Sequence, residues 1–272
     1  MINRFLSDDP TALLSAPIGE GFPPSLVAQR KRFREIRRAI EISERSLRRY
    51  FLSFAKIIAN YAPTLALPFA LDEFDDSVER VLGPEIIRTE SELALVLDAT
   101  LRTVVTLGTD HAQLEPVLAG IDLAFDVDQV EVQRWLRSTR LELIKGINET
   151  TRREIASVLR RGQSEGWSMA QMAKGVEARA RGMSARRARL IAQSETIRAY
   201  SKGALFAYEA SGIVEGKRWV DGQVRACAYC SALHGRVVSL REQFAGGPFG
   251  GVEGPPLHPG CRCSIAPELS ND

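Results

Sequence analysis

Every cysteine of the chain falls within one short C-terminal stretch, and this clustering constrains the fold more than any other feature. The first pair is Cys227-Ala-Tyr-Cys230, and a second cluster follows at His258-Pro-Gly-Cys261-Arg-Cys263. A Cys-x-x-Cys pair lets one tight turn present two thiolates to a single ion, and a second Cys/His cluster completes the four ligands of a structural zinc site. The spacing therefore predicts a zinc knuckle in this stretch.

Five side chains compete for the four ligand positions, namely Cys227, Cys230, His258, Cys261 and Cys263. His258 and Cys261 have the usual two-residue gap. Cys261 and Cys263 are one residue apart and would point to opposite sides of an extended strand. Local geometry favours His258 with Cys261, although a kinked backbone would admit Cys263, so the sequence leaves the choice of four open.

Two other states of the thiols are compatible with the same spacing, namely two disulfides or four free cysteines. Residues 1–14 contain Arg4, Asp8 and Asp9 and no continuous apolar run, so we predict no export signal. Disulfides persist in oxidising compartments and are rare in the cytosol. This expectation favours zinc over disulfides.

A catalytic zinc is a further alternative, and it would need an open coordination position and a general base. The nearest candidates, His234 and Glu253, sit in no recognisable motif. A zinc-dependent nuclease or hydrolase would use His234, His258 and Glu195 around the metal. The number of protein ligands distinguishes a structural zinc site from a catalytic one, because four ligands close the coordination sphere and three leave room for water.

The chain is long enough, at 272 residues, for one large or two modest domains. Its most apolar window, residues 57–71, is interrupted by Asn60, Pro63 and Pro68, so no membrane span is predicted. Residues 1–150 carry 18 basic and 23 acidic side chains, a net −5, and residues 151–272 carry 18 and 11, a net +7. This asymmetry indicates either contact with double-stranded DNA or solvated basic helix faces.

Hydrophobic periodicity predicts a mainly α-helical body, followed by a small C-terminal region with strands and the zinc knuckle. Proline and glycine make residues 1–24 an arm. We predict an N-terminal helical region over 25–128 and a second domain over 129–272, with the knuckle at 217–267. Short strands are predicted at 217–220 and 236–240, around the first cysteine pair.

Proline, glycine and capping residues predict the helix boundaries. A helix over 25–61 ends at Pro63, and a short helix that opens at residues 72–76 is broken by Pro84. A helix over 91–107 precedes a loop that places His111 at the surface. Asn148 caps a new helix within the apolar pattern that begins at residue 130.

Two further helices are predicted in the basic half of the chain. Ser168 and Gln171 form a capping box for a helix over 169–180. That helix ends at Gly182, and a separate helix over 185–210 closes at Gly212.

The C-terminal half carries a series of motifs in fixed order: Gly166-Trp-Ser168, the segment from Arg189 to Thr196, Tyr200, Gly203 and Tyr208, Gly216-Lys-Arg-Trp219, the Cys227-Ala-Tyr-Cys230 unit and the ending Pro256-Leu-His-Pro-Gly-Cys-Arg-Cys263. In this series the chain resembles the phage head morphogenesis proteins of the Mu F-like and SPP1 minor-head type. The family usually reads Arg-Thr-Glu where this chain has Gln193-Ser194-Glu195. Residues 1–130 carry no part of the resemblance.

The resemblance implies a low-copy minor capsid protein with no catalytic activity. Its implied partners are the portal, other capsid or scaffold proteins and, in part of the family, the packaged DNA. Its implied location is the virion interior, with the bacterial cytoplasm as the site of assembly. A plain zinc-stabilised DNA-binding module remains the third alternative. Glu195 is expected to pair with Arg198 or Lys202, or to orient a zinc-ligating histidine or Arg262.

Overall fold

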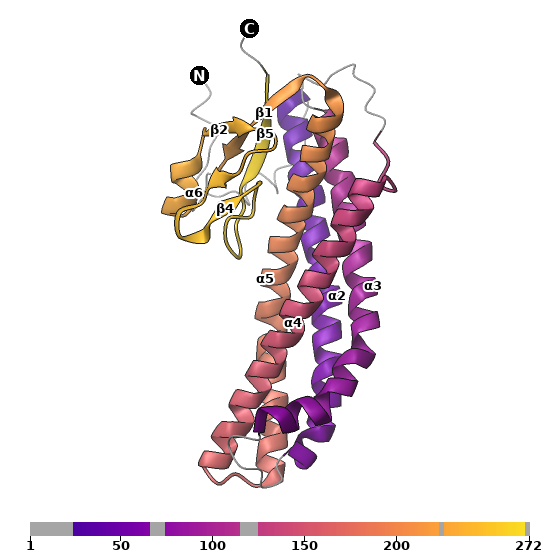
Figure 1. Ribbon diagram of the computed structural model, residues 1–272, viewed down its shortest axis with the longest axis vertical. Helices are drawn as coiled ribbons and strands as arrows, with labels where there is room; N and C mark the ends of the chain where they lie inside the picture. The colour runs from indigo at the N-terminus through magenta and orange to yellow at the C-terminus, as the bar shows by residue number, and fades with distance from the viewer. Residues whose placement is uncertain (1–23, 66–73, 115–124, 223–225, 270–272) are drawn as a thin grey trace. The chain divides into compact units, whose positions relative to one another are not determined.

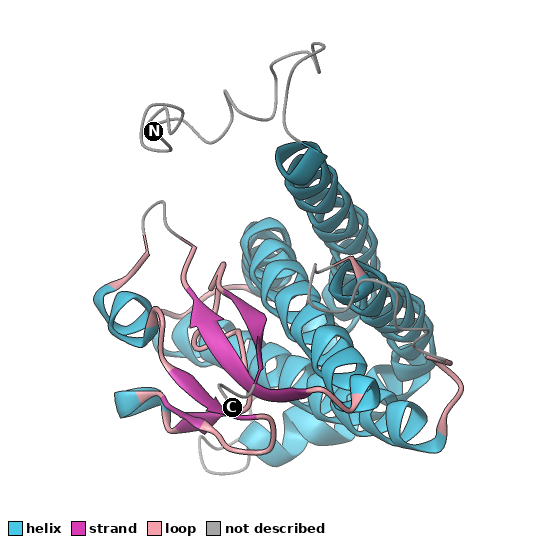
Figure 2. Ribbon diagram, turned by 90° about the horizontal axis from the view of Figure 1, so that it is seen from above, coloured by secondary structure: helices cyan, strands magenta, loops and turns pink. Residues whose placement is uncertain are grey.

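A computed structural model describes residues 24–65, 74–114, 125–222 and 226–269 of the chain. The predicted arm over 1–24 lies outside the described residues apart from Pro24. Most of the described residues are helical, and the strands gather in the C-terminal region (Figures 1 and 2). The prediction of a mainly α-helical chain with a small β-containing tail is therefore confirmed.

Four long helices form the body: α2 (Pro24–Leu65), α3 (Phe74–Gln113), α4 (Val130–Ser164) and α5 (Met169–Ser211). The chain divides into two compact units. The knuckle unit comprises the described residues of Met1–Glu41, Leu101–Val127 and Gln193–Asp272, and the helical unit comprises those of Ile42–Thr100 and Asp128–Ala192. Helices α2, α3 and α5 contribute residues to both units. The division at residues 128/129 made from the sequence stays a prediction.

The core of the helical unit contains apolar side chains at helical spacing from α2, α4 and α5, namely Phe54, Ile155, Ala156, Leu159, Met172 and Val176. Arg187 of α5 is held against α4 by two hydrogen bonds. Its guanidinium donates to the Thr151 hydroxyl at 2.8 Å and to the Ile147 carbonyl at 2.6 Å. Burial lowers the pKa of Arg187, and these acceptors compensate for the lost water.

Within the knuckle unit, α3 and α5 approach so closely that glycine is required at the crossing. A Cβ on Gly203 would lie 2.1 Å from the Val105 carbonyl oxygen, and one on Gly108 would lie 2.2 Å from the Tyr200 carbonyl oxygen. Thr109 donates its hydroxyl proton to the Gly203 carbonyl at 3.1 Å. The crossing explains Gly203 of the sequence motif, because a side chain at this position would overlap the α3 backbone.

The C-terminal strands form two small antiparallel sheets. In the first, β1 (Val214–Val220) lies between β2 (Val237–Ser239) and β5 (Ser264–Leu269). The second pairs β3 (Phe244–Ala245) with β4 (Gly251–Val252), on either side of the short 3-10 turn η2 (Gly247–Phe249). The one-and-a-half-turn helix α6 (Ala228–Leu233) follows β1. The strands predicted at 217–220 and 236–240 are thus confirmed.

These sheets share one apolar core with α5. Trp219 is fully buried and meets the Phe244 ring edge-on, with centroids 5.2 Å apart. The cluster also includes Ala204, Ala207 and Tyr208 from α5. Three of the four cysteines belong to this core. The C-terminal region therefore packs on residues 204–208, near the end of α5.

Three predicted interruptions of the long helices are wrong. Helix α3 runs through Pro84, and α4 and α5 run without a break through Asn148 and Gly182. A proline costs a helix about 3 kcal/mol and a glycine about 1 kcal/mol. Tertiary packing supplies most of the stability of a helix in a folded protein and outweighs such a local cost. Asn148 does not cap a helix but is buried, and its amide donates to Glu90 at 2.8 Å.

The helix end predicted at Pro63 is also displaced, because α2 continues to Leu65. The boundaries predicted around α5 are confirmed. Ser168 and Gln171 exchange hydrogen bonds between side chain and backbone, as a capping box does. Gly212 follows the helix with φ of 68°, the left-handed conformation that favours glycine.

His111 is not a surface residue, as its loop-like sequence predicted, but a buried residue of α3. Its Nε2 lies 2.6 Å from a Glu35 carboxylate oxygen, and its Nδ1 lies 3.2 Å from the Tyr200 hydroxyl. The error arose because both partners lie more than seventy positions away along the chain.

In the part of the chain that the structure describes, no helix has the length and apolarity that a membrane crossing needs.

Candidate metal centre

The candidate ligands come from two local structures that face each other in the knuckle unit. The first is the ligand turn, residues 227–230, in which Cys227 caps α6 and its sulfur accepts the Cys230 backbone N–H at 3.4 Å. The second is the ligand loop, residues 258–261, in which the Cys261 N–H donates to the His258 carbonyl at 3.1 Å. Each local structure places two donors on the same side of the backbone.

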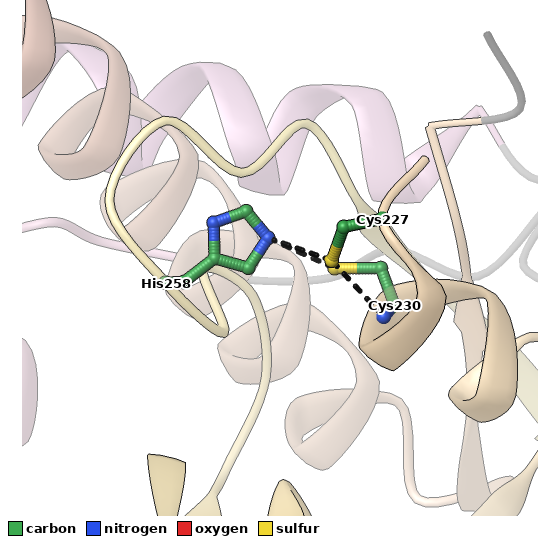
Figure 3. Close-up of side chains that lie close together, drawn as sticks. All are labelled: Cys227, Cys230 and His258. Carbon is green, nitrogen blue, oxygen red and sulfur yellow. Dashed lines mark hydrogen bonds between the residues drawn. The ribbon is translucent and has the colours of Figure 1, made fainter. Parts of the chain in front are cut away.

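The histidine ring of the ligand loop points at the sulfurs of the ligand turn (Figure 3). His258 Nε2 lies 3.2 Å from Cys227 Sγ and 3.3 Å from Cys230 Sγ. Cys230 Sγ lies 3.8 Å from Cys261 Sγ. All four side chains therefore meet around one small volume.

Five donors converge here as two overlapping groups. Cys227, Cys230 and His258 have donor atoms within 4.8 Å of one another, and so do Cys230, Cys261 and Cys263. Cys230 belongs to both groups. The structure thus brings together all five residues that the sequence singled out, with Cys230 at the junction.

The donor distances fit a tetrahedral zinc ion. Zn–S bonds of about 2.3 Å and Zn–N bonds of about 2.0–2.1 Å imply separations of about 3.8 Å between two sulfurs and about 3.6 Å between sulfur and nitrogen. The observed 3.8 Å between Cys230 and Cys261 matches the first value. The two sulfur–nitrogen distances are a few tenths of an ångström shorter than the second. Thiolate and imidazole are also the donors that zinc prefers in structural sites.

His258 is oriented as a metal ligand through its other ring nitrogen. Its Nδ1 lies 3.0 Å from the Pro259 carbonyl oxygen, an acceptor, so this nitrogen carries the proton. The Nε2 lone pair then points to the two sulfurs. Metal-ligating histidines almost always donate their second N–H in this way.

The thiols are electrostatically unequal. A hydrogen bond from the Cys263 thiol, opposed by burial, lowers the pKa of Cys261 to about 5. Burial raises the pKa of Cys230 to about 12, and the Cys261 thiolate raises the pKa of Cys263. The hydrogen bond from the Cys230 N–H also lowers the pKa of Cys227, so Cys227 and Cys261 are the two thiols that ionise more readily than a free cysteine. A metal ion is needed to hold more negative sulfurs in this buried cluster.

The other groups considered for a catalytic centre lie elsewhere. His234 pairs with Asp221, with Nδ1 3.3 Å from the carboxylate, and Glu253 pairs with Lys202 at 3.0 Å. Glu195 lies 3.0 Å from the Arg198 guanidinium, which is one of the two pairings predicted for it. Within the described residues, His234 and Glu195 belong to neither ligand group.

Two residues of α5 that the sequence analysis did not assign to the site contact the ligand loop. Gln193 donates to the Gly260 carbonyl at 2.8 Å, and Ser194 accepts from the Gly260 N–H at 3.1 Å. The sequence did mark both positions, as the place where the chain departs from the family pattern. Nothing local to residues 193–194 predicts a partner more than sixty positions away.

Comparison with known proteins adds a family to this geometry. Residues 153–266 match the family model described as Phage Mu protein F like protein. The resemblance proposed from the sequence motifs is therefore confirmed. The match begins within α4, covers all of α5 and includes the five candidate ligands. The searches of curated proteins and of solved structures found no match. The Mu F-like domain supports a phage head-morphogenesis protein.

Proposed function

We propose that this chain is a minor capsid protein of a phage or prophage, that it acts in head morphogenesis beside the portal, and that it carries out no catalysis. The match of residues 153–266 to the Mu F-like family carries this proposal. Its partners are the portal and other capsid or scaffold proteins. The protein resides in the virion interior after assembly in the bacterial cytoplasm.

Within this role, the knuckle holds one structural zinc ion through Cys227, Cys230, His258 and Cys261. The tautomer of His258 supports it as a ligand, and the 3.8 Å separation of the Cys230 and Cys261 sulfurs supports the fourth position. Cys263 then acts as a hydrogen-bond donor to the Cys261 sulfur. Four protein ligands close the coordination sphere, which favours a structural ion over a hydrolytic one.

The small size of the knuckle supports a stabilising role for the ion. Strands β2, β3 and β4 have three, two and two residues, so they bury little surface on their own. In such modules the free energy of metal binding supplies the stability that burial does not. The ion would fasten the segment between β1 and β5, which includes all three of these short strands.

The zinc proposal is tested by elemental analysis of the full chain purified under reducing conditions. We expect about one zinc per chain, lost in Cys227→Ser and in Cys261→Ser but kept in Cys263→Ser, which removes a thiol outside the ligand set. Loss of zinc in Cys263→Ser together with its retention in His258→Ala would assign a four-cysteine site instead.

The assembly role is tested in the phage genome. Deletion of the coding sequence should reduce the yield of DNA-filled heads, counted by electron microscopy, and the wild-type chain supplied in trans should restore it. A Cys227→Ser chain should restore less. Normal head yields in the deletion would contradict a role in head morphogenesis.

Charge distribution supports a second function, contact with the packaged DNA. Residues 128–192 carry 14 basic and 7 acidic side chains, whereas residues 193–272 carry 8 of each. The net positive charge of residues 128–272 therefore comes from residues 128–192, which include α4 and the first half of α5. Arg153, Arg186 and Arg189 are exposed cations of this segment.

DNA contact predicts an affinity that falls steeply with salt concentration, because bound cations release counterions from the duplex. Arg186→Glu and Arg189→Glu should each weaken binding to a double-stranded fragment and reduce the salt slope. Arg241→Glu makes the same charge change outside residues 128–192 and serves as the control. Equal affinities for all three variants would contradict a DNA surface on α5.

A further inference from the structure

The ligand loop is attached to α5 by a pair of hydrogen bonds to a single residue. Gly260 lies between the ligands His258 and Cys261, with φ of 78°. Its carbonyl accepts from Gln193 Nε2 at 2.8 Å, and its N–H donates to Ser194 Oγ at 3.1 Å. Two consecutive side chains of one helix therefore hold both polar groups of one loop residue.

This attachment acts at the position where the loop is most easily deformed. Glycine explores left-handed and right-handed conformations with little difference in energy, so an isolated Pro-Gly step would populate several backbone states. The neighbouring Cys261 carbonyl also lies 3.5 Å from Gln193 Nε2. A loop held in one state keeps His258 and Cys261 directed at the ligand turn.

We propose that Gln193 and Ser194 are positioning residues of the metal centre: they set the affinity of the ligand loop for its ion by holding Gly260. The inference rests on the zinc site proposed above. Outer groups that orient metal ligands typically change metal affinity by about 10–100-fold when they are removed. Because the attachment joins the loop to α5, metal binding and the packing of the knuckle on α5 stabilise each other.

Another contact between α5 and the knuckle offers a control. Lys202 pairs with Glu253 at 3.0 Å, in the segment that precedes the ligand loop. It fastens the knuckle to α5 without touching any candidate ligand or Gly260. Its removal should therefore loosen packing and leave the geometry of the ligand loop unchanged.

The experiment measures zinc affinity of the full chain by competition with a chromophoric chelator. Ser194→Thr keeps the hydroxyl, and Ser194→Val introduces a side chain of the same shape as threonine but without the hydroxyl. We expect Ser194→Val to bind zinc about 10–100-fold more weakly than Ser194→Thr, and Gln193→Met to be weakened similarly against the wild type. Lys202→Gln should bind zinc within about twofold of the wild type, because this partly exposed ion pair contributes little free energy and contacts no ligand.

The absorption spectrum of cobalt(II) bound in place of zinc supplies a second readout. This spectrum would not change if Gln193 and Ser194 only packed the knuckle on α5. The ligand-field bands report the angles between the ligands, so they should shift in Ser194→Val and Gln193→Met and stay unchanged in Lys202→Gln. Equal zinc affinities and equal spectra for Ser194→Thr and Ser194→Val would overturn the positioning role alone. A wild-type chain that binds neither metal would overturn the zinc site with it.

Discussion

The close crossing of α3 and α5 predicts that Gly203→Ala severely destabilises the chain. The added Cβ would lie 2.1 Å from the Val105 carbonyl oxygen, 2.9 Å from its carbon and 3.1 Å from the Thr109 nitrogen. All three are backbone atoms, so no side-chain rotation relieves the overlap. The two helices must separate by roughly 1 Å, since ordinary contacts of Cβ begin near 3.4 Å.

The magnitude follows from three contributions. Overpacking of this kind costs about 3 kcal/mol. Separation of the helices also disrupts the buried hydrogen bond from Thr109 to the Gly203 carbonyl, at about 1 kcal/mol. Alanine regains about 1 kcal/mol through its higher helix propensity. We expect a net loss of about 3 kcal/mol in the free energy of unfolding.

The assay is urea denaturation followed by far-ultraviolet circular dichroism, with Gly182→Ala as the matched control. Gly182 lies in the same helix, and nothing lies within 4 Å of a Cβ placed on it. Gly182→Ala should therefore stabilise the chain by about 0.5–1 kcal/mol. A Gly203→Ala chain within about 0.5 kcal/mol of the wild type would refute the crossing. A destabilised Gly182→Ala chain would refute the unbroken helix.

Three further predictions concern the metal, a buried histidine and a buried arginine. Chelation of zinc under reducing conditions should lower the thermal unfolding midpoint of the wild type. The midpoint of Cys227→Ser should stay unchanged, since that variant has no zinc site to lose. An unchanged wild-type midpoint would argue against a stabilising ion. Burial lowers the pKa of His111, against the opposing effect of its hydrogen bond to the Glu35 carboxylate. The contribution of His111 to stability is therefore present above the unfolded pKa of about 6.5 and lost as the pH falls through the folded pKa. His111→Gln should flatten this acid limb in unfolding free energies measured against pH, whereas His234→Gln, with a half-exposed ring, should keep it. Arg187→Met should lower the free energy of unfolding, measured by urea denaturation, by about 2 kcal/mol. The substitution removes the two hydrogen bonds that the charged guanidinium donates to the Ile147 carbonyl and the Thr151 hydroxyl. Arg189→Met, at an exposed position of the same helix, should lower it by less than about 0.5 kcal/mol.

The parts of this protein that sequence reasoning recovers are those set by local chemistry. The gap between Cys227 and Cys230 suits a turn at the start of a helix, and the structure has that turn. Ser168 and Gln171 satisfy each other's backbone groups over three residues. The ligand loop likewise closes on itself between His258 and Cys261. Such features depend on neighbours in the chain and can be read from it.

The errors occur where distant residues outweigh a local preference. Pro84 and Gly182 lower helix stability locally, yet α3 and α5 run through them without a break. His111 sits among loop-like residues, yet Glu35 and Tyr200 satisfy both of its ring nitrogens inside the fold. The contact of Ser194 with Gly260 spans 66 positions. No periodicity or spacing in the sequence encodes these pairings.

The proposed zinc site is closed by three sulfur ligands and one nitrogen ligand. Zinc K-edge X-ray absorption of the full chain tests this ligand set, because scattering distances separate sulfur from nitrogen. We expect three sulfurs at about 2.3 Å and one nitrogen at about 2.0–2.1 Å. A shell of four sulfurs would exclude His258 as a ligand, and a shell completed by a water oxygen would contradict the structural role of the ion.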